Sequence, residues 1–266
     1  MQRRVPAGPD LVPTPAPASM PDPVPEWGDK RRTRVGVLGG SFNPAHEGHS
    51  HVAHLALHRL RLDQVWLLVS PGNPLKSSDG MASLADRLAS ARSIADGRRV
   101  VATAVESRLH TRYTYDTLRV LRQRFPRVLF VWIMGADNLV QLPRWQHWTG
   151  IAATMPFAVM PRPTYNQRAL AGQAAERLRP FLLPARRAPS LAGSGTPAWT
   201  FLPARQNPAS ATAIRSRGDT DPALAWPPRL LLPPLLVTTP LATTQPVVIQ
   251  PVIIQPVIIE PAASHT

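Results

Sequence analysis

The sequence predicts an α/β fold with a doubly wound parallel sheet, and three observations lead to this fold class. Short apolar runs that suit buried parallel strands alternate with segments of helical periodicity. A glycine-rich turn joins the first apolar run to the first helical segment, which places backbone N–H groups where an anion can bind. The unusual polar side chains follow the ends of the expected strands, and such sheets bind ligands at that edge.

The first half of the expected sheet begins at a short apolar run. Residues 34–38 are apolar enough for a buried strand, and residues 50–62 carry apolar side chains at helical spacing. Residues 64–69 form a second apolar run, and the proline and glycine content of residues 70–76 predicts a loop after it. Helical spacing returns at residues 83–95. This half therefore alternates strand and helix.

The second half of the expected sheet repeats this alternation around a strongly apolar central run. Leu118 and Leu121 lie on the inward face of a helix with Asp116 in its first turn. In order, we expect a strand at 98–102, a helix at 114–124, a strand at 127–134, a helical stretch leading into 144–148, a strand near 155–160, a helix near 167–177 and a last short helix at 209–217.

The two ends of the chain differ in composition from its middle. Residues 1–33 are rich in proline and lack apolar periodicity, so we expect a disordered, solvated arm without a secretory signal, and Met20 is a candidate translation start. Residues 219–266 contain a five-residue Pro-Val-Ile repeat, which interrupts any helix, central strand or membrane span. This tail is either a docking segment or a repeat without a role. The foldable domain is expected at 34–218.

Composition limits the classes of function. The chain has no cysteine, which excludes disulfides, thiolate metal sites and cysteine nucleophiles and is compatible with the expected cytoplasmic location. Its formal charge is +14, but only two of its thirty Lys and Arg residues are lysines, and the arginines are scattered. We interpret this charge as attraction to small anionic ligands, and we expect neither a nucleic-acid nor a membrane partner. The oligomeric state is left open.

The stretch at 39–49, Gly-Gly-Ser-Phe-Asn-Pro-Ala-His-Glu-Gly-His, follows the first strand and begins the first helix. His46 and His49 both lie at this helix start, where each ring can donate a hydrogen bond to a phosphate oxygen. The pattern is neither a P-loop nor the G-x-G-x-x-G fingerprint. Taken separately, the glycines suit an ordinary turn and the histidines a surface or core position.

Other candidate residues follow later strands, and each has a simpler interpretation. Lys76 follows the second strand and could reach a phosphate, although loop lysines are usually just solvated. Asp137, two residues after Gly135, suits either a ribose or a helix N-cap. Thr114 could contact a ligand carboxylate or cap its helix, and Trp145 could stack on a ring or belong to the core. Ser210, Thr212 and Arg215 offer hydroxyls and a guanidinium to a phosphate.

The stretch at 39–49 resembles, position for position, the signature of nucleotidylyltransferases in which (H/T)-x-G-H follows G-G-x-F-[DN]-P. Tyr-Thr-x-Asp-Thr-Leu at 113–118, Gly-x-Asp at 135–137 and Trp-x-x-Trp at 145–148 narrow the resemblance to bacterial nicotinate-nucleotide adenylyltransferases. That family's I-S-S-T-x-I-R motif corresponds to residues 209–215, where Ala209 and Ala211 depart from it and remove at most one hydroxyl.

The resemblance implies an adenylyltransferase that moves AMP from ATP to nicotinate mononucleotide, with Mg²⁺ held mainly by the phosphates and no metal ligand from the protein. Catalysis would rest on His46, His49 and Arg215. The implied ATP-binding set is Gly39, Gly40, Ser41, Phe42, His46, His49, Gly135, Asp137, Ser210, Thr212 and Arg215, and the implied acceptor-binding set is Asn43, Lys76, Thr114 and Trp145.

Three other functions stay open. The same chemistry could serve nicotinamide mononucleotide or phosphopantetheine, or transfer a cytidylyl group. The sequence leaves the choice between nicotinate and nicotinamide mononucleotide as acceptor the most open. A non-catalytic nucleotide-binding scaffold could use the proline-rich ends for partners, although it would not require both His46 and His49. An RNA-binding protein would show salt-sensitive retention on nucleic acid.

Overall fold

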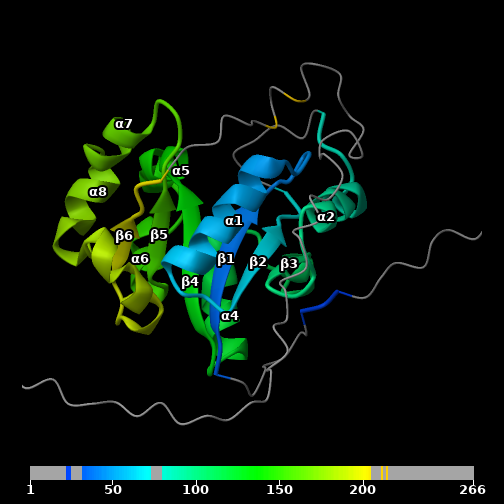
Figure 1. The fold of residues 1–266 in the computed structure, drawn as a ribbon, viewed down its shortest axis with the longest axis horizontal. Helices are drawn as coiled ribbons and strands as arrows, with labels where there is room; N and C mark the ends of the chain where they lie inside the picture. Colours follow the sequence, from blue (N-terminus) through cyan, green and yellow to red (C-terminus); the bar gives the residue numbers. More distant parts are fainter. Residues whose placement is uncertain (1–21, 25–31, 73–79, 205–210, 212–213, 215–266) are drawn as a thin grey trace, which may run out of the picture. The chain divides into compact units, whose positions relative to one another are not determined.

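A parallel sheet forms the centre of the structure, a computed structural model that describes residues 22–24, 32–72, 80–204, 211 and 214 (Figure 1). All of these residues belong to one compact unit within residues 1–227. The six described strands have the order β3-β2-β1-β4-β5-β6, and every neighbouring pair is parallel. They are β1 (Arg34–Gly40), β2 (Gln64–Val69), β3 (Val100–Thr103), β4 (Leu129–Gly135), β5 (Phe157–Met160) and β6 (Trp199–Phe201).

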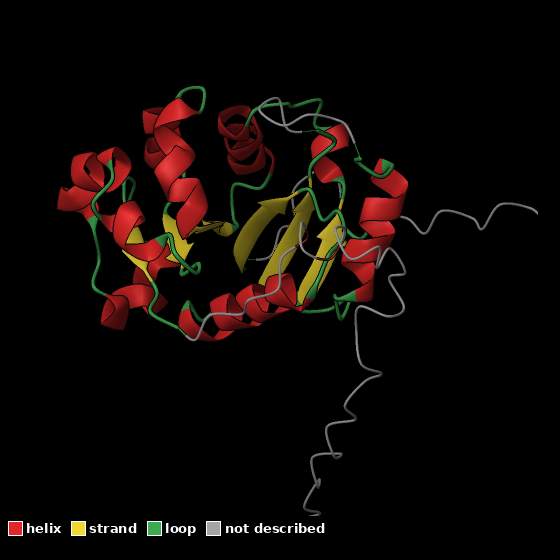
Figure 2. Ribbon diagram, turned by 90° about the horizontal axis from the view of Figure 1, so that it is seen from above, coloured by secondary structure: helices red, strands yellow, loops and turns green. Residues whose placement is uncertain are grey.

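Helices cover both faces of the sheet, as Figure 2 shows from above. They are α1 (Glu47–Arg59), α2 (Leu84–Ser93), α3 (Val105–Arg108), α4 (Thr114–Arg124), α5 (Ala136–Gln141), α6 (Trp148–Thr154), α7 (Asn166–Leu170) and α8 (Gln173–Leu178). Three 3-10 helices, η1 (Leu142–Arg144), η2 (Arg179–Phe181) and η3 (Ala185–Gly193), complete the described helices. The predicted doubly wound parallel sheet is thereby confirmed.

Two hydrophobic cores lie on the two faces because successive strand residues point to opposite sides. In β2, Trp66 and Leu68 belong to the core that includes residues of α3 to α8, whereas Val65 and Leu67 belong to the core that includes residues of α1, α2 and η3. A strand buried on both faces is apolar at every position, which is why these strands are recognisable as continuous apolar runs.

Several boundaries differ from the sequence-based expectation. Helix α1 begins at Glu47 and not at residue 50, because the His46 side chain caps it. The helix expected near 167–177 is divided into α7 and α8 at Gly172, which has an extended backbone and is the N-cap residue of α8. A Cβ atom at this position would lie 2.9 Å from the Arg168 carbonyl oxygen. Strand β6 lies in a segment expected to be a polar connection. Helices α3 and α6 were not expected either.

Two expectations about the ends can be compared with the structure. The prediction of a solvated arm for residues 1–33 is wrong for residues 22–24, where Val24 is 2% exposed and belongs to one of the cores. Most of the helix expected at 209–217, and the whole repeat tail, lie outside the described residues. In the part of the chain that is described, no helix has both the length and the apolarity that a membrane crossing requires.

Candidate active site

A cavity of about 420 Å³ lies at the carboxyl-terminal edge of the sheet. The ends of β1, β2 and β4 form its floor, through residues such as Gly40, Leu68 and Ile133. The central strands β1 and β4 are neighbours whose helices cover opposite faces, so the crevice is at the point where doubly wound sheets bind ligands. Of the residues predicted from the sequence, six line it: Gly39, Gly40, Ser41, Thr114, Asp137 and Trp145.

The β1–α1 loop, taken as residues 41–49 with the start of α1 included, borders one side of the cavity through Ser41 and is held by contacts to α2 and the segment before it. Asn43 donates from Nδ2 to the Gly80 carbonyl oxygen at 2.9 Å, and its Oδ1 accepts from the Ala82 N–H at 3.2 Å. The Ala45 N–H donates to the hydroxyl of Ser90 in α2. Asn43, predicted to bind substrate, is thus a fixing residue of the loop in this structure, and it is not among the cavity-lining residues.

Arg87, in α2, holds the same loop through its guanidinium group. Its side chain is 2% exposed and its guanidinium donates to the carbonyl oxygens of Ser41, Ser70, Pro71 and Ala82. Burial lowers the pKa of this guanidinium from its usual value. Arg87 therefore ties the segment after β1 to the segment after β2 and fixes the cavity floor. The sequence analysis missed it, because a single arginine within a helix carries no signal.

Phe42 accounts for the glycine at position 40 but not for the one at position 39. Its backbone has φ of +50°, and its ring is 1% exposed. A Cβ atom on Gly40 would lie 3.1 Å from the Phe42 ring, and the ring centroid of Phe42 is 4.8 Å from that of His49. Phe42, predicted to bind ATP, thus supports Gly40 and His49 from the core side and does not line the cavity.

His46 and His49 form a reciprocal cap at the start of α1. His46 Nδ1 accepts from the Gly48 N–H at 3.1 Å, and His49 Nδ1 accepts from the His46 N–H at 3.2 Å. Because a backbone N–H can only donate, both Nδ1 atoms are unprotonated, and a neutral ring then carries its proton on Nε2. Each imidazole is thereby left with one N–H donor for a ligand.

Both imidazoles are neutral at neutral pH. Burial, together with the charge of Arg162, lowers the pKa of His46 to about 4. Burial, His46 and Arg162 lower the pKa of His49 to about 3. His46 is 3% exposed, His49 is partly exposed, and neither is among the cavity-lining residues. The two rings contact each other at an interplanar angle of 39°, with centroids 3.9 Å apart.

Asp137 lines the same cavity from the first turn of α5. Its Oδ1 atom is 3.4 Å from Nε of Arg162, two residues beyond the end of β5. A Cβ atom on Gly135 would lie only 2.3 Å from Asp137 Oδ1, so this carboxylate position requires a glycine at 135. The sequence analysis missed Arg162, although a basic residue just beyond a predicted strand end belongs to the edge where the other candidates were found.

The opposite side of the cavity is the α3–α4 wall, formed by Glu106, Arg112, Tyr113, Thr114 and Thr117. The Thr117 hydroxyl donates to Glu106 Oε1 at 2.9 Å. Burial raises the pKa of the Glu106 carboxyl, against hydrogen bonds from Thr117 and Ser70 that act in the other direction. Thr114 is the first residue of α4, and the N-cap position is Tyr113, which makes no side-chain cap. The capping role considered for Thr114 is therefore wrong.

Trp145 lies on the cavity surface and against the core at once. Its ring centroid is 5.7 Å from that of Trp132, and both residues line the cavity. Its Nε1 atom is a buried donor without a hydrogen-bond partner in the described structure. Trp148 packs against the core and is not among the lining residues, so the two indoles have different surroundings.

The remaining predicted residues cannot be placed. Lys76, Ser210, Thr212 and Arg215 lie outside the described residues. Two lining residues that the sequence analysis missed, Arg112 and Arg144, add positive charge to the cavity. Within the described ranges, no group of three or more His, Asp or Glu side chains could hold a metal ion.

Comparison with known proteins gives a consistent family. A family model described as cytidylyltransferase-like matches residues 37–217. A protein of Gluconacetobacter diazotrophicus named probable nicotinate-nucleotide adenylyltransferase is 59% identical over 190 residues, which cover 71% of this chain and 88% of that protein. A protein of the same name from Gluconobacter oxydans is 58% identical over 189 residues, covering 71% and 97%.

The fold is also found among solved structures. Nicotinic acid mononucleotide adenylyltransferase of Plasmodium falciparum, complexed with NaAD, superposes with a TM-score of 0.52 at 16% identity, covering 69% of this chain and 83% of that one. At this level of identity the likeness supports the fold alone.

Proposed function

Since the chain belongs to the cytidylyltransferase-like family, and within it to the nicotinate-nucleotide adenylyltransferases, we propose that it transfers AMP from ATP to nicotinate mononucleotide, forming deamido-NAD and pyrophosphate. The single structural observation that carries the proposal is the pair of neutral imidazoles at the start of α1, each with a fixed Nε2–H donor, next to a cavity at the carboxyl-terminal edge of the sheet.

The proposed reaction is a displacement at the α-phosphorus of ATP. A phosphate oxygen of nicotinate mononucleotide forms the new P–O bond, and the bond from the α-phosphorus to the oxygen that bridges to the β-phosphate breaks. A phosphate monoester has a second pKa of about 6 and is largely dianionic at neutral pH, so no protein base is required. Catalysis then consists of holding the two phosphates together and stabilising the charge that develops.

The proposed role of His46 and His49 is to donate hydrogen bonds to ATP phosphate oxygens. Their low pKa values favour neutral donors in the free protein. The backbone bonds to Nδ1 fix both ring orientations before the substrate binds, so little reorganisation is required. Arg215, with Ser210 and Thr212 in support, and Lys76 remain proposed phosphate ligands on sequence grounds.

The proposed place for the ATP ribose is Asp137, with Gly135 giving its carboxylate room. Arg162 pairs with Asp137, and its positive charge contributes to the low pKa values of His46 and His49. Its place near all three side chains supports a role beside the ATP phosphates. Gly39, Gly40 and Ser41 supply backbone at the end of β1, where a nucleotide can approach closely. Mg²⁺ is proposed to arrive with ATP and to be held mainly by phosphate oxygens, where it would neutralise developing charge.

The acceptor is proposed to occupy the α3–α4 wall and Trp145. The indole can stack on a pyridine ring, and its Nε1 has no other described partner. Arg112 and Arg144 line the same cavity, and two cations favour a nicotinate carboxylate over a neutral amide. The domain boundaries at 34 and 218 and a cytoplasmic site of action remain predictions of the sequence.

The test is pyrophosphate release from ATP and Mg²⁺, with nicotinate mononucleotide and nicotinamide mononucleotide supplied separately. We expect a strong preference for the acid. Equal rates would replace the proposal by a dual-specificity enzyme. No turnover with either acceptor would overturn it, and phosphopantetheine and then a non-catalytic nucleotide-binding role would be tested next.

A further inference from the structure

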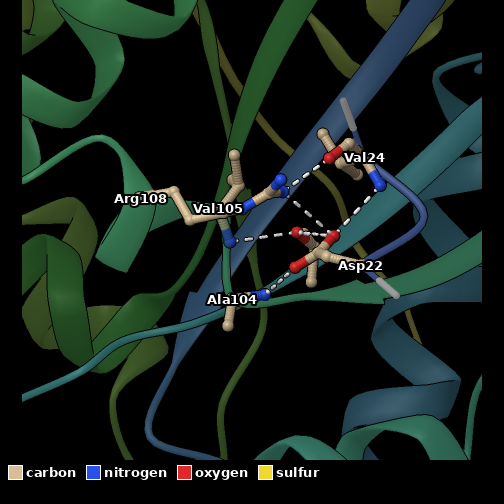
Figure 3. A network of polar contacts seen from close by, with 6 residues as sticks. Asp22, Val24, Ala104, Val105 and Arg108 are labelled. Atoms are coloured by element: carbon tan, nitrogen blue, oxygen red, sulfur yellow. Dashed lines mark hydrogen bonds and ion pairs between the residues drawn. The ribbon is translucent and has the colours of Figure 1, made fainter. Parts of the chain in front are cut away.

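We propose that Asp22, in the arm that precedes the family-model region, is a positioning residue of the α3–α4 wall and thereby tunes binding of the acceptor. This inference rests on the proposed function, because it concerns the acceptor side of the same cavity. The observation behind it is a network of polar contacts between residues 22–24 and the junction of β3 with α3 (Figure 3).

Asp22 uses both carboxylate oxygens in this network. Oδ1 accepts from the Thr103 hydroxyl at 2.7 Å, and Oδ2 accepts from the Ala104 N–H at 2.8 Å. The side chain is 13% exposed, and Nη2 of Arg108 lies 3.4 Å from Oδ1 (Figure 3). Contacts of this kind to a largely buried carboxylate are strong, since each donor is aligned on a charged acceptor.

Val24 anchors the same segment. It is 2% exposed within the core, and its N–H donates to Asp22 Oδ1 at 3.0 Å. Arg108 donates a hydrogen bond to the Val24 carbonyl oxygen, so this arginine contacts residues 22 and 24 together (Figure 3). An apolar side chain in the core and a carboxylate on the backbone hold this part of the arm at one place.

The N-cap residue of α3 makes no side-chain cap, and Asp22 holds the two residues just before the helix from a distant part of the chain. The helix has only four residues, and its N-cap residue Ala104 makes no side-chain hydrogen bond to it. So short a helix is not stable by itself and depends on external contacts. Asp22 satisfies the Ala104 N–H and holds the Thr103 hydroxyl, which in turn accepts from the Val105 N–H at 3.0 Å.

The second residue of α3 is Glu106, which connects this network to the cavity. Glu106 lines the cavity and accepts from the Thr117 hydroxyl, which also lies 3.2 Å from the Tyr113 carbonyl oxygen. Displacing α3 would therefore move Glu106, and with it the start of α4 where Thr114 lies. The β1–α1 loop shares no hydrogen bond with Asp22 in the described structure, so the ATP side should be affected much less.

The experiment compares full-length Asp22→Ala and Asp22→Asn with wild type, and uses Asp10→Asn as a matched control on the same arm. We expect Asp22→Ala to raise the KM for nicotinate mononucleotide about 10-fold, while the KM for ATP and kcat change by less than about 2-fold; the loss of a bond to a charged group has this order of effect. Asp22→Asn keeps one acceptor oxygen and should lie between the two. Asp10→Asn should match wild type.

Hydrogen exchange of residues 103–118 provides a readout that does not depend on turnover. Faster exchange in Asp22→Ala and not in Asp10→Asn is expected. A lower melting temperature with both KM values and the exchange unchanged would overturn the inference, and so would an equal rise of both KM values. If wild type itself turned over no acceptor, the proposed function would fail, and the exchange result would still decide whether Asp22 positions the wall.

Discussion

The β1–α1 loop and the α3–α4 wall face the same cavity but are stabilised by different contacts. The loop is contiguous in sequence, and its two histidines are fixed by backbone N–H groups within three residues of them. The wall is held together by hydrogen bonds between side chains. The Thr117 hydroxyl donates to Glu106, and the Thr103 hydroxyl, farther from the cavity, donates to Asp22. Histidine rings that are fixed by nearby backbone groups suit a constant partner such as a polyphosphate. A wall fixed by side chains can change with the acceptor.

The two regions also respond to pH in opposite directions. His46 and His49 have pKa values lowered mainly by burial, so acid destabilises the loop. Glu106 has a pKa raised by burial, so the wall contains a carboxyl whose ionised form is disfavoured. Neutral donors thus lie next to the cavity on one side and a buried acid lines it on the other, and variants of each region test them separately.

The largest expected effect is on the loop. His49→Ala removes the Nε2–H donor, and kcat should fall about 100- to 1,000-fold, as when one donor is removed from a preorganised anion site. The comparison is made by steady-state kinetics at saturating ATP and acceptor. His58→Ala, an exposed position on the same helix, is the control and should retain wild-type turnover. Turnover near wild type in His49→Ala would remove the loop from the catalytic role, provided both variants are folded by circular dichroism.

The next effect concerns the Asp137 carboxylate in the same cavity. Gly135→Ala places a Cβ atom 2.3 Å from Asp137 Oδ1, so the carboxylate must move. We expect the KM for ATP to rise about 10-fold or more, the order of a lost bond to a charged group. Gly193→Ala, where a Cβ atom would meet nothing within 4 Å, controls for the substitution itself. If the KM for ATP were unchanged, Asp137 would not contact the nucleotide.

Sequence alone could predict the loop, because its information is local. The glycines, Phe42 and the two histidines lie within eleven consecutive positions, between a recognisable strand and helix. The continuous apolar strands likewise predicted the parallel sheet, since burial on both faces requires apolar residues at every position. Strand β6 was not predicted, because its three residues lie among prolines and polar residues. Only its pairing with β5 in the structure identifies it as a strand.

The wall could be predicted only in part. Thr114 and Trp145 were predicted from their residue type and position and then from family motifs, whereas Glu106 lies in a four-residue helix without periodicity. The contact from Asp22 to Thr103 spans 81 positions and begins in a segment whose composition indicates a solvated arm. Contacts between single polar residues so far apart leave no pattern in one sequence.

A smaller effect is expected in the pH dependence of stability. His46 titrates near 6.5 when unfolded and near 4 when folded, so between these values the unfolded chain binds more protons. Stability is therefore lost as pH falls from about 6.5 towards 4, by about 1–2 kcal/mol between pH 7 and 5 from this group. His46→Asn keeps a good N-cap and removes the titration, so its urea-unfolding free energy should fall less over this range.

The prediction concerns how steeply the unfolding free energy changes with pH in each protein, and not how stable His46→Asn is at any single pH. His49 still titrates in His46→Asn, so part of the slope should remain. Thermal and urea unfolding at several pH values between 4 and 8 measure it. An identical slope in both proteins would mean that His46 is not kept neutral by the fold.

The smallest expected effect is on the wall and has the opposite sign. The folded pKa of Glu106 is raised, so stability is lost as the pH rises from the unfolded value of about 4.5 to the folded value, and the cost then stays constant at higher pH. The cost is absent well below pH 4.5, where the carboxyl is protonated in both states. Glu106→Gln should therefore be slightly more stable than wild type at pH 8 and lose this advantage at pH 4. The exposed Glu47→Gln controls for removing one negative charge. If Glu106→Gln were still more stable than wild type at pH 4, its gain in stability would come from packing and not from the loss of an ionised carboxylate, and the predicted difference in pH response between wall and loop would be wrong.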